Sequence, residues 1–319
     1  MLYFVKVDGQ FGYVDRTGKI VVSPQFRQVS SYGREAFAGL QTNGELFILD
    51  ASGATIAKVR HIDGFHGGFS DGLLCVKSAE KYGFIDAYGK ILIDFKFFSP
   101  SQFVLGKAIV QDSGRFGVID TTGSWVLEPS FEYIVDIHER STSFCVRVSE
   151  EQYKVIDFSG QEATDRVFGA LHSECENVVP FRRVGEVAWG WLDLVTHEEV
   201  EPKYTEVGLC SQATIPFQLN GKWGIAKTDG AIKLPACYDF LGPISSERRR
   251  FCTGASKYGA LRGGKYGYLN GDSQVAIPAQ FDRANDFNND AARVSVGSRP
   301  RIKSGWIDEA GRYFWAPSA

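Results

Sequence analysis

One short pattern recurs nine times along this chain of 319 residues. Clear copies join an aromatic residue, a glycine, a large apolar residue, an aliphatic residue and an aspartate, as in Phe11–Asp15 and Tyr82–Asp86. The second position of the copies falls at residues 12, 47, 83, 117, 154, 190, 224, 267 and 305. A unit of this length buries little apolar surface alone, so stacked neighbours must share a core. The spacing therefore predicts a repeat architecture from one end of the chain to the other.

The aspartate of each copy predicts a turn. A glycine follows three residues later in many copies, as in Asp15–Gly18 and Asp120–Gly123. Aspartate at the first position and glycine at the fourth are typical of a hairpin turn whose glycine has a positive φ. We expect the carboxylate to accept hydrogen bonds from amides of its own turn. One carboxylate per turn supplies too few oxygens for calcium, so no metal site is assigned to these residues.

Short apolar strands surround the turn. A strand such as 19–22 follows it and ends near a proline and an aromatic residue, as in Pro24 and Phe26. Proline cannot donate to a strand ladder. A third strand, such as 144–148, leads to the next aromatic-glycine step, and we expect the aromatic side chain to pack against the adjoining unit while the glycine lets a neighbour come close.

Each unit is thus predicted to be a three-stranded antiparallel meander. The fold class is all-β, with tandem meanders forming a propeller-like toroid and an open β-solenoid or superhelix as the alternative. One repeat domain is expected over residues 1–319. Its predicted units are residues 1–34, 35–69, 70–104, 105–140, 141–176, 177–211, 212–247, 248–288 and 289–319.

The pattern resembles the bacterial WG-repeat family, in which an aromatic-glycine step precedes an aspartate turn, an aliphatic strand and a proline-x-aromatic segment. The resemblance covers essentially the whole chain. The literal Trp-Gly dipeptide stands at Trp189-Gly190 and Trp223-Gly224, and Phe or Tyr replaces the tryptophan elsewhere. The second and fifth copies lack the glycine, and the seventh lacks the aspartate. The resemblance implies a repeat scaffold without assigned chemistry, and it supplies no catalytic residues.

Composition narrows the classes of partner and compartment. Lysine and arginine number 35 against 38 aspartate and glutamate residues, so nucleic acid and membrane are not expected partners. No signal peptide and no long apolar segment is visible, which predicts a cytoplasmic protein. The six cysteines are far apart and lack a C-x-x-C motif, so we expect reduced and mostly buried thiols.

No motif predicts catalysis, a cofactor or a metal. The segment Gly259–Lys265 resembles a phosphate-binding loop, but Tyr266 replaces the required Ser or Thr and no helix is expected to follow. His61, His66 and Cys75 are the closest soft ligands, and their spacing fits no known zinc pattern. We therefore predict that the protein is not an enzyme, and we assign no catalytic, cofactor-binding or metal-binding residue.

Partner contacts are predicted in two inter-repeat loops. Arg248, Arg249 and Arg250 lie in the longest insertion, Gly242 to Phe251, and would meet an anionic patch on a partner. His138 and Arg140 lie in a second such loop.

The tryptophans Trp191 and Trp306, beside the repeat glycines, are expected in the core.

The preferred function is a non-catalytic scaffold that binds another protein. The family resemblance suggests one setting, the neutralisation or accommodation of a toxin or effector by an immunity protein. A glycan or cell-wall binding module is the first alternative, because aromatic-rich hairpin repeats resemble choline-binding modules. An enzyme with a site in a central channel is the second alternative.

Overall fold

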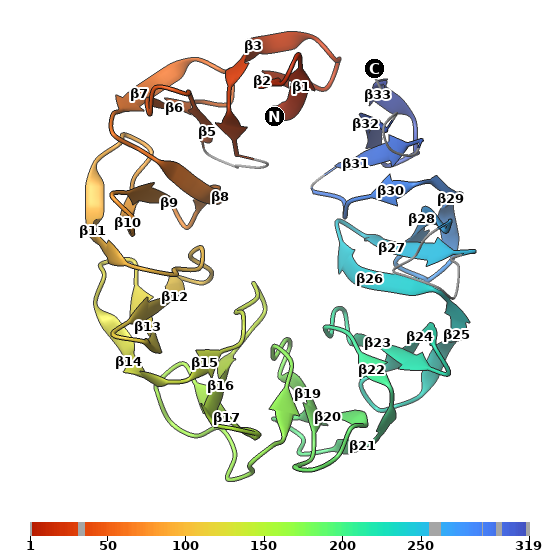
Figure 1. The fold of residues 1–319 in the computed structure, drawn as a ribbon. Coiled ribbons are helices and arrows are strands. Elements are labelled where there is room, and N and C mark those ends of the chain that lie inside the picture. The colour runs from red at the N-terminus through yellow and green to blue at the C-terminus, as the bar shows by residue number, and fades with distance from the viewer. Residues whose placement is uncertain (1, 31–35, 255–262, 289, 298–301, 317–319) are drawn as a thin grey trace. The chain divides into compact units, whose positions relative to one another are not determined.

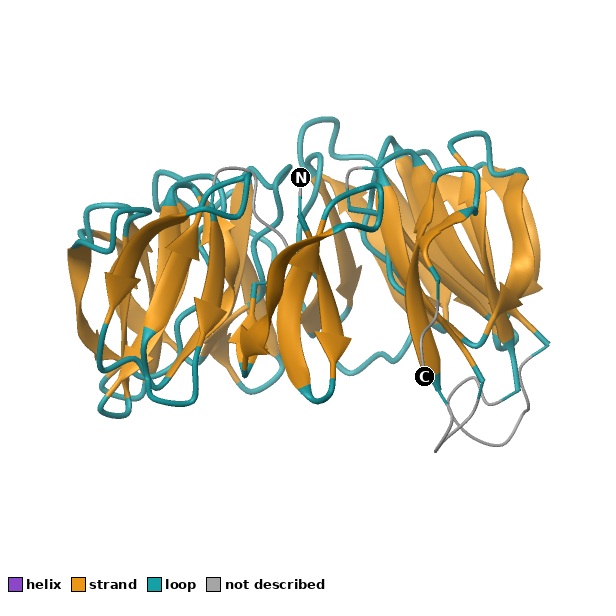
Figure 2. Ribbon diagram, turned by 90° about the horizontal axis from the view of Figure 1, so that it is seen from above, coloured by secondary structure: helices purple, strands orange, loops and turns teal. Residues whose placement is uncertain are grey.

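The computed structural model describes residues 2–30, 36–254, 263–288, 290–297 and 302–316. All regular elements in these ranges are β-strands, joined by turns and loops (Figure 2), which confirms the all-β prediction. The strands form nine small antiparallel sheets, which we number 1 to 9 in chain order (Figure 1). Within the described ranges no helix has the length and apolarity needed to cross a membrane.

The first four sheets contain the following strands. Sheet 1 is β1 (Tyr3–Val7), β2 (Gln10–Val14) and β3 (Ile20–Phe26). Sheet 2 is β4 (Gln28–Val29), β5 (Phe37–Leu40), β6 (Leu46–Leu49) and β7 (Thr55–Val59). Sheet 3 is β8 (Gly64–Ser70), β9 (Leu73–Ser78), β10 (Lys81–Ile85) and β11 (Ile91–Phe97). Sheet 4 is β12 (Lys107–Asp112), β13 (Arg115–Asp120) and β14 (Trp125–Phe131).

The other five sheets follow in the same order. Sheet 5 is β15 (Tyr133–Ile134), β16 (Ser143–Ser149) and β17 (Gln152–Asp157). Sheet 6 is β18 (Ala170–Leu171), β19 (Val178–Arg182), β20 (Trp189–Asp193) and β21 (Glu199–Tyr204). Sheet 7 is β22 (Glu206–Val207), β23 (Thr214–Leu219), β24 (Lys222–Lys227) and β25 (Ile232–Tyr238). Sheet 8 is β26 (Phe240–Ser245), β27 (Arg248–Thr253), β28 (Lys265–Asn270) and β29 (Val275–Phe281). Sheet 9 is β30 (Arg283–Ala284), β31 (Ala291–Val296), β32 (Lys303–Asp308) and β33 (Tyr313–Trp315).

Most sheets differ from the predicted three-stranded meander by one strand. Six of the nine have four strands, and sheets 1, 4 and 5 have three. The added strand comes first in its sheet and has two residues in sheets 2, 6, 7 and 9, too few to show an alternating pattern. Sheets 2, 3 and 5 to 9 therefore begin earlier in the chain than the predicted unit that contains their aromatic-glycine step, whereas sheet 4 begins within its predicted unit.

The chain divides into two compact units, which we call unit 1 and unit 2. Unit 1 contains residues 1–139, 146–149 and 158–161. Unit 2 contains residues 140–145, 150–157 and 162–319.

The repeat glycine lets the last strand of a sheet cross close to the strand that carries it. A Cβ built on Gly190 would lie 2.2 Å from the carbonyl oxygen of Val200, and one on Gly12 would lie 2.4 Å from that of Val22. The strand pairing is irregular at these points, as expected for a bulge. The glycine is therefore required by the backbone of its own sheet.

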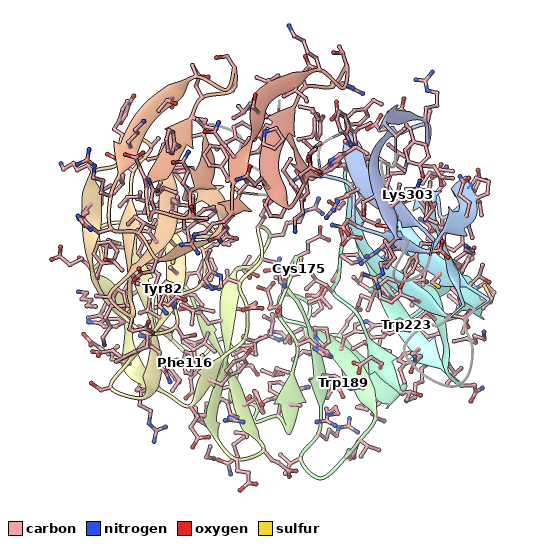
Figure 3. The ribbon with its side chains drawn as sticks, turned by 45° about the horizontal axis from the view of Figure 1, so that its top comes forward. Tyr82, Phe116, Cys175, Trp189, Trp223 and Lys303 are labelled. Carbon is pink, nitrogen blue, oxygen red and sulfur yellow. The ribbon has the colours of Figure 1, made fainter. Side chains whose placement is uncertain are left out.

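Aromatic side chains join the strands and then the sheets. Tyr82, Phe116, Trp189 and Trp223 hold the same position before the repeat glycine (Figure 3). Each is paired across the sheet with the aromatic residue that ends the last strand, as in Tyr82 with Phe97. Phe116 also contacts Tyr133 of sheet 5 at 5.9 Å between ring centroids, as predicted for this position. In other units the ring at the end of the last strand makes the contact with the next sheet: Phe26 with Phe47, Phe97 with Trp125, and Tyr204 with Phe217.

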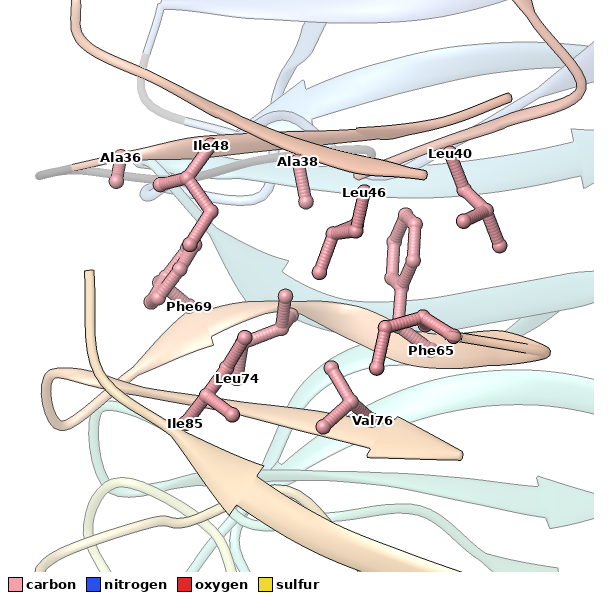
Figure 4. Packing of buried hydrophobic residues seen from close by; sticks show 11 residues of the cluster. Ala36, Ala38, Leu40, Leu46, Ile48, Phe65, Phe69, Leu74, Val76 and Ile85 are labelled. Carbon is pink, nitrogen blue, oxygen red and sulfur yellow. The ribbon is translucent and has the colours of Figure 1, made fainter. Parts of the chain in front are cut away.

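Apolar side chains fill the space between consecutive sheets. In unit 1, sheets 2 and 3 face each other through aliphatic and aromatic side chains (Figure 4). Leu46 and Ile48 from β6 and Leu74 and Val76 from β9 are all fully buried. Trp191 and Trp306 are 1% and 8% exposed, which confirms that both belong to the core.

The aspartate turns have the predicted geometry. The Asp15 carboxylate accepts hydrogen bonds from the N–H groups of Thr17 and Lys19 at 2.8 and 3.1 Å, and Gly18 has a φ of 82°. The side-chain hydrogen bond from Thr17 is the main cause of the lowered pKa of Asp15. The same pattern recurs at Asp50, Asp86, Asp120 and Asp308.

The glycine of this turn also sets the distance to the preceding sheet. A Cβ on Gly53 would lie 2.7 Å from Val21, and one on Gly89 would lie 2.7 Å from Val59.

Candidate interaction surface

Four consecutive turns of unit 2 depart from the pattern of the corresponding turns in unit 1. They connect the first and second strands of sheets 5 to 8 and contain residues 140–142, 175–177, 211–213 and 245–248. We call these residues the turn row.

Three turns of the row carry side chains where backbone geometry favours glycine. Both central residues of each turn have a positive φ, with 55° and 64° at Glu176 and Asn177. Gln212 and Ala213 both have 51°, and the third pair is Ser246 and Glu247. A left-handed conformation costs a non-glycine residue about 1–2 kcal/mol. The corresponding turns of unit 1 have glycine at the second position: Asp71-Gly72 and Leu105-Gly106.

The side chains gained in this way join neighbouring turns to one another. Glu176 accepts hydrogen bonds from the N–H groups of Gln212 and Ala213 at 3.1 and 3.0 Å, and it pairs with Arg140. The Gln212 side chain donates to Glu247 at 3.1 Å. Burial acts to raise the pKa of Glu176, but hydrogen bonds from Ala213 and Arg140 hold it below its ordinary value. The row is thus a continuous polar chain that runs across four sheets.

A buried glutamate lies beneath the row. Glu174 is 1% exposed and occupies a position three residues after Leu171, which pairs with the second strand of sheet 6. The equivalent residues in sheets 7 and 9 are Cys210 and Phe287, at 0% and 1% exposure. The Glu174 carboxylate accepts hydrogen bonds from the N–H groups of Thr142, Ser143 and Asn177 at 2.6, 3.2 and 2.6 Å. It therefore fastens the turn of sheet 5 to that of sheet 6.

The Glu174 carboxyl group should make stability depend on pH. Burial raises its pKa above the ordinary value, and this outweighs the N–H hydrogen bonds that lower it. The folded chain therefore holds this proton more tightly than the unfolded chain does. The resulting stabilisation is present below the ordinary glutamate pKa and is lost as the pH rises through the raised pKa.

We expect Glu174→Gln to reveal this dependence. The amide cannot accept from all three N–H groups, so the variant should be less stable by about 1–3 kcal/mol at about pH 4, and the deficit should shrink toward about pH 7. Urea unfolding of both proteins across this range measures the difference. Parallel curves for the two proteins would contradict the assignment.

The three predicted arginines are not in a loop. Arg248, Arg249 and Arg250 are the first three residues of β27, and only 246–247 form the turn before it. Successive side chains of a strand point to opposite faces, so Arg249 faces the core and is 2% exposed. Arg250 pairs with Asp286 at 3.2 Å. The extra length of this unit lies between β27 and β28, where residues 255–262 are outside the described part.

The second predicted loop contributes to the turn row through Arg140, the partner of Glu176. His138 lies in the same connection between β15 and β16, and burial lowers its pKa against the opposing effect of Asp136.

The loop-like segment, the histidines and the cysteines considered in the sequence analysis are placed as follows. Of the loop-like segment Gly259–Lys265, residues 259–262 lie outside the described part, and Lys265 pairs with Asp282 at 2.6 Å. His66 and Cys75 are neighbours across β8 and β9. The described residues contain no group of three or more His, Cys, Asp or Glu side chains placed to hold a metal ion. All six cysteines are free thiols, and only Cys237 is exposed.

Sequence reasoning missed Glu174, Glu176, Gln212 and Glu247. Glu174 could have been identified because it is a charged residue at a repeat position that is apolar in the other aligned repeats. The signal at the turns is the absence of the glycine that Gly72 and Gly106 supply in unit 1.

Comparison with known families supports the repeat assignment. Residues 11–45, 116–139 and 266–299 match the family model of the WG containing repeat. These three segments are copies of the WG containing repeat. No protein of curated function is similar enough to this chain to match it.

Solved structures share the fold of this chain. A crystal structure of a eukaryotic initiation factor has a TM-score of 0.69 and 11% identity over 99% of this chain and 96% of that one. Dihydro-heme d1 dehydrogenase NirN has a TM-score of 0.50 and 13% identity, with 93% and 76% coverage. BamB from Moraxella catarrhalis has a TM-score of 0.48 and 14% identity, with 88% and 93% coverage. At these identities the likeness to the initiation factor concerns the fold alone, which is that of a β-propeller.

Proposed function

We propose that the protein is a non-catalytic scaffold that binds another folded protein through the turn row of unit 2. The observation that carries this proposal is the run of three turns that keep side chains in left-handed backbone positions. Strain of this kind persists where the residues are needed for something other than stability. Loops held on a rigid sheet framework are also where binding residues concentrate.

The chemistry of the row favours a protein partner. Its polar groups are the Gln212 amide, the Glu176 and Glu247 carboxylates and the Arg140 guanidinium, and the formal net charge of the chain is only −3. Such a surface offers directional polar contacts without the excess of positive charge that nucleic acid requires.

Two observations favour binding over catalysis or glycan recognition. Burial raises the pKa of the Cys145 and Cys175 thiols to about 12, so neither supplies a thiolate nucleophile at neutral pH. Trp189 is 7% exposed, with His172 stacked on it and Arg182 over its ring, so its face is not free for a sugar.

The finer assignment extends the family resemblance. We propose that the partner is a toxin or effector protein that this chain neutralises or accommodates in the bacterial cytoplasm.

The test uses the full chain as bait and a matched control turn. Partners captured from the native host are identified and purified, and their affinity is measured for the wild type and for the double variant Gln212→Arg/Glu247→Arg. Affinity should fall at least about tenfold, equivalent to about 1.4 kcal/mol, because the variant breaks the polar chain and reverses its charge.

Leu105→Arg places the same side chain in the equivalent turn of unit 1, where Leu105 is 43% exposed. This control should bind as the wild type does. Equal losses in both variants, or full affinity in the double variant, would reject the turn row as the binding surface.

A further inference from the structure

Arg249 is a charged residue in a core position of the repeat. In sheet 8 it lies two residues before Phe251, which pairs with Leu241. The residues at this position in sheets 6, 7 and 9 are all apolar and fully buried: Val179, Ile215 and Ala292. Arg249 is 2% exposed.

The guanidinium group has only neutral hydrogen-bond partners. It donates to the carbonyl oxygen of Gly242 at 2.8 Å and to the Thr214 hydroxyl at 3.1 Å. A guanidinium carries five N–H donors. In the part of the chain that the structure describes, no carboxylate lies within ion-pair distance of Arg249.

This side chain stays charged at neutral pH. Burial lowers the pKa of Arg249 to about 10, against a small opposing effect of Cys210. Burial likewise raises the pKa of Cys210, so its thiol is neutral and cannot balance the charge.

Stability alone does not account for an arginine here. A buried charge without a counter-ion is costly, and apolar residues of similar size commonly match or exceed the stability of buried ionic groups. The neighbouring sheets show that apolar residues fit the position.

We propose that Arg249 forms an anion-binding site that takes a carboxylate, a ligand site distinct from the turn-row contacts. The planar fork of the guanidinium matches the two oxygens of a carboxylate. One unbalanced positive charge matches a monoanion better than a dianion such as phosphate, which would leave a net negative charge at the site.

Entry of the ligand requires the turn of sheet 7 to yield. The Thr214 hydroxyl, which bonds Arg249, itself donates to the Ser211 carbonyl at 2.7 Å across that turn. Gln212 and Ala213 between them both have positive φ, so the turn that must move is already strained.

Thermal unfolding of the full chain tests the site. Sodium acetate should raise the Tm of the wild type to a plateau, while sodium chloride at equal ionic strength should not. The ligand binds only the folded state, so the shift reports binding directly.

The variant Arg249→Leu restores the apolar pattern of the other sheets and should fold with an equal or higher Tm that acetate no longer raises. Arg249→Lys keeps the charge without the fork and should show a weaker acetate response, which provides a second test if the leucine variant does not fold. Arg166→Leu, which removes a surface arginine paired with Glu199 at 2.7 Å, is the matched control and should respond as the wild type does.

Three results would overturn the proposal: no saturable acetate shift in the wild type, an equal shift in Arg249→Leu, or a larger shift with phosphate than with acetate. N-acetyl-glutamate amide separates two sources of the carboxylate. If it raises the Tm as acetate does, an acidic side chain of a protein reaches the site. If only acetate does so, the ligand is a small free acid. Neither measurement involves the partner of the turn row, so each proposal fails independently of the other.

Discussion

Replacing Gly190 with alanine should lower the free energy of unfolding by about 3 kcal/mol. The added Cβ would lie 2.2 Å from the Val200 carbonyl oxygen and 2.8 Å from the Pro202 nitrogen. Both atoms belong to the backbone of β21, so no side-chain rotation relieves the clash. The last strand must move away, which also separates Trp189 from Tyr204, its partner across the sheet.

Urea unfolding followed by tryptophan fluorescence measures this loss. Gly64→Ala is the matched control, because the nearest atom to a Cβ at Gly64 is the Gln28 side-chain oxygen at 3.8 Å. This control should remain within about 0.5 kcal/mol of the wild type. If both variants lose the same amount, the cost arises from β-strand backbone effects in general, and the close crossing is not its cause.

Replacing Trp191 with alanine should cost about 4 kcal/mol. The side chain is 1% exposed, stacks on Tyr204 with ring centroids 5.3 Å apart, and donates to the Thr228 carbonyl at 2.7 Å. The stack with Tyr204 lies within sheet 6, whereas the hydrogen bond extends to the turn of sheet 7, and the side chain belongs to a buried cluster that includes Phe217 and Ala226 of sheet 7. Truncation removes the contacts and leaves a cavity between two sheets that cannot close without shifting both.

Two companion variants separate the contributions at Trp191. Trp191→Phe keeps a ring in the site and removes the hydrogen bond, and it should lose about 1–2 kcal/mol. Val195→Ala changes a 67% exposed side chain in the next turn and should be nearly neutral. A loss below about 1 kcal/mol for Trp191→Ala would show that the boundary between the sheets does not depend on this residue.

Local chemistry made much of the fold predictable. The aspartate turns were correct because the carboxylate and the glycine act within five residues, as at Asp15 and Gly18. The glycine of the aromatic step was correctly linked to close backbone approach. The short first strands were not predicted, because two-residue strands such as β4 and β22 are defined by partners elsewhere in the sheet and not by their own pattern.

The candidate surface was harder to predict than the fold. Arg248 to Arg250 read as a charged loop in sequence, yet pairing with β28 makes them a strand and buries the middle one. Glu174 and Glu176 differ by two positions, but one is buried beneath the row and the other joins two turns. The roles of these two residues depend on which turns of neighbouring repeats lie against each other, and the sequence of a single repeat does not contain this information.

The glycine of the aspartate turn has an evolutionary consequence. Gly53 lies against Val21, Gly89 against Val59, and Gly311 against Ile277. The same contact between a turn glycine and an aliphatic side chain therefore recurs between consecutive sheets in both compact units. Because the contact is the same at each of these boundaries, a repeat can be duplicated, deleted or exchanged by recombination without new contacts having to arise. The turns between the first and second strands of each sheet take no part in this glycine contact, so their sequences can change without disturbing it. A lineage can therefore acquire new binding specificity by exchanging repeats that keep the same contact with their neighbours.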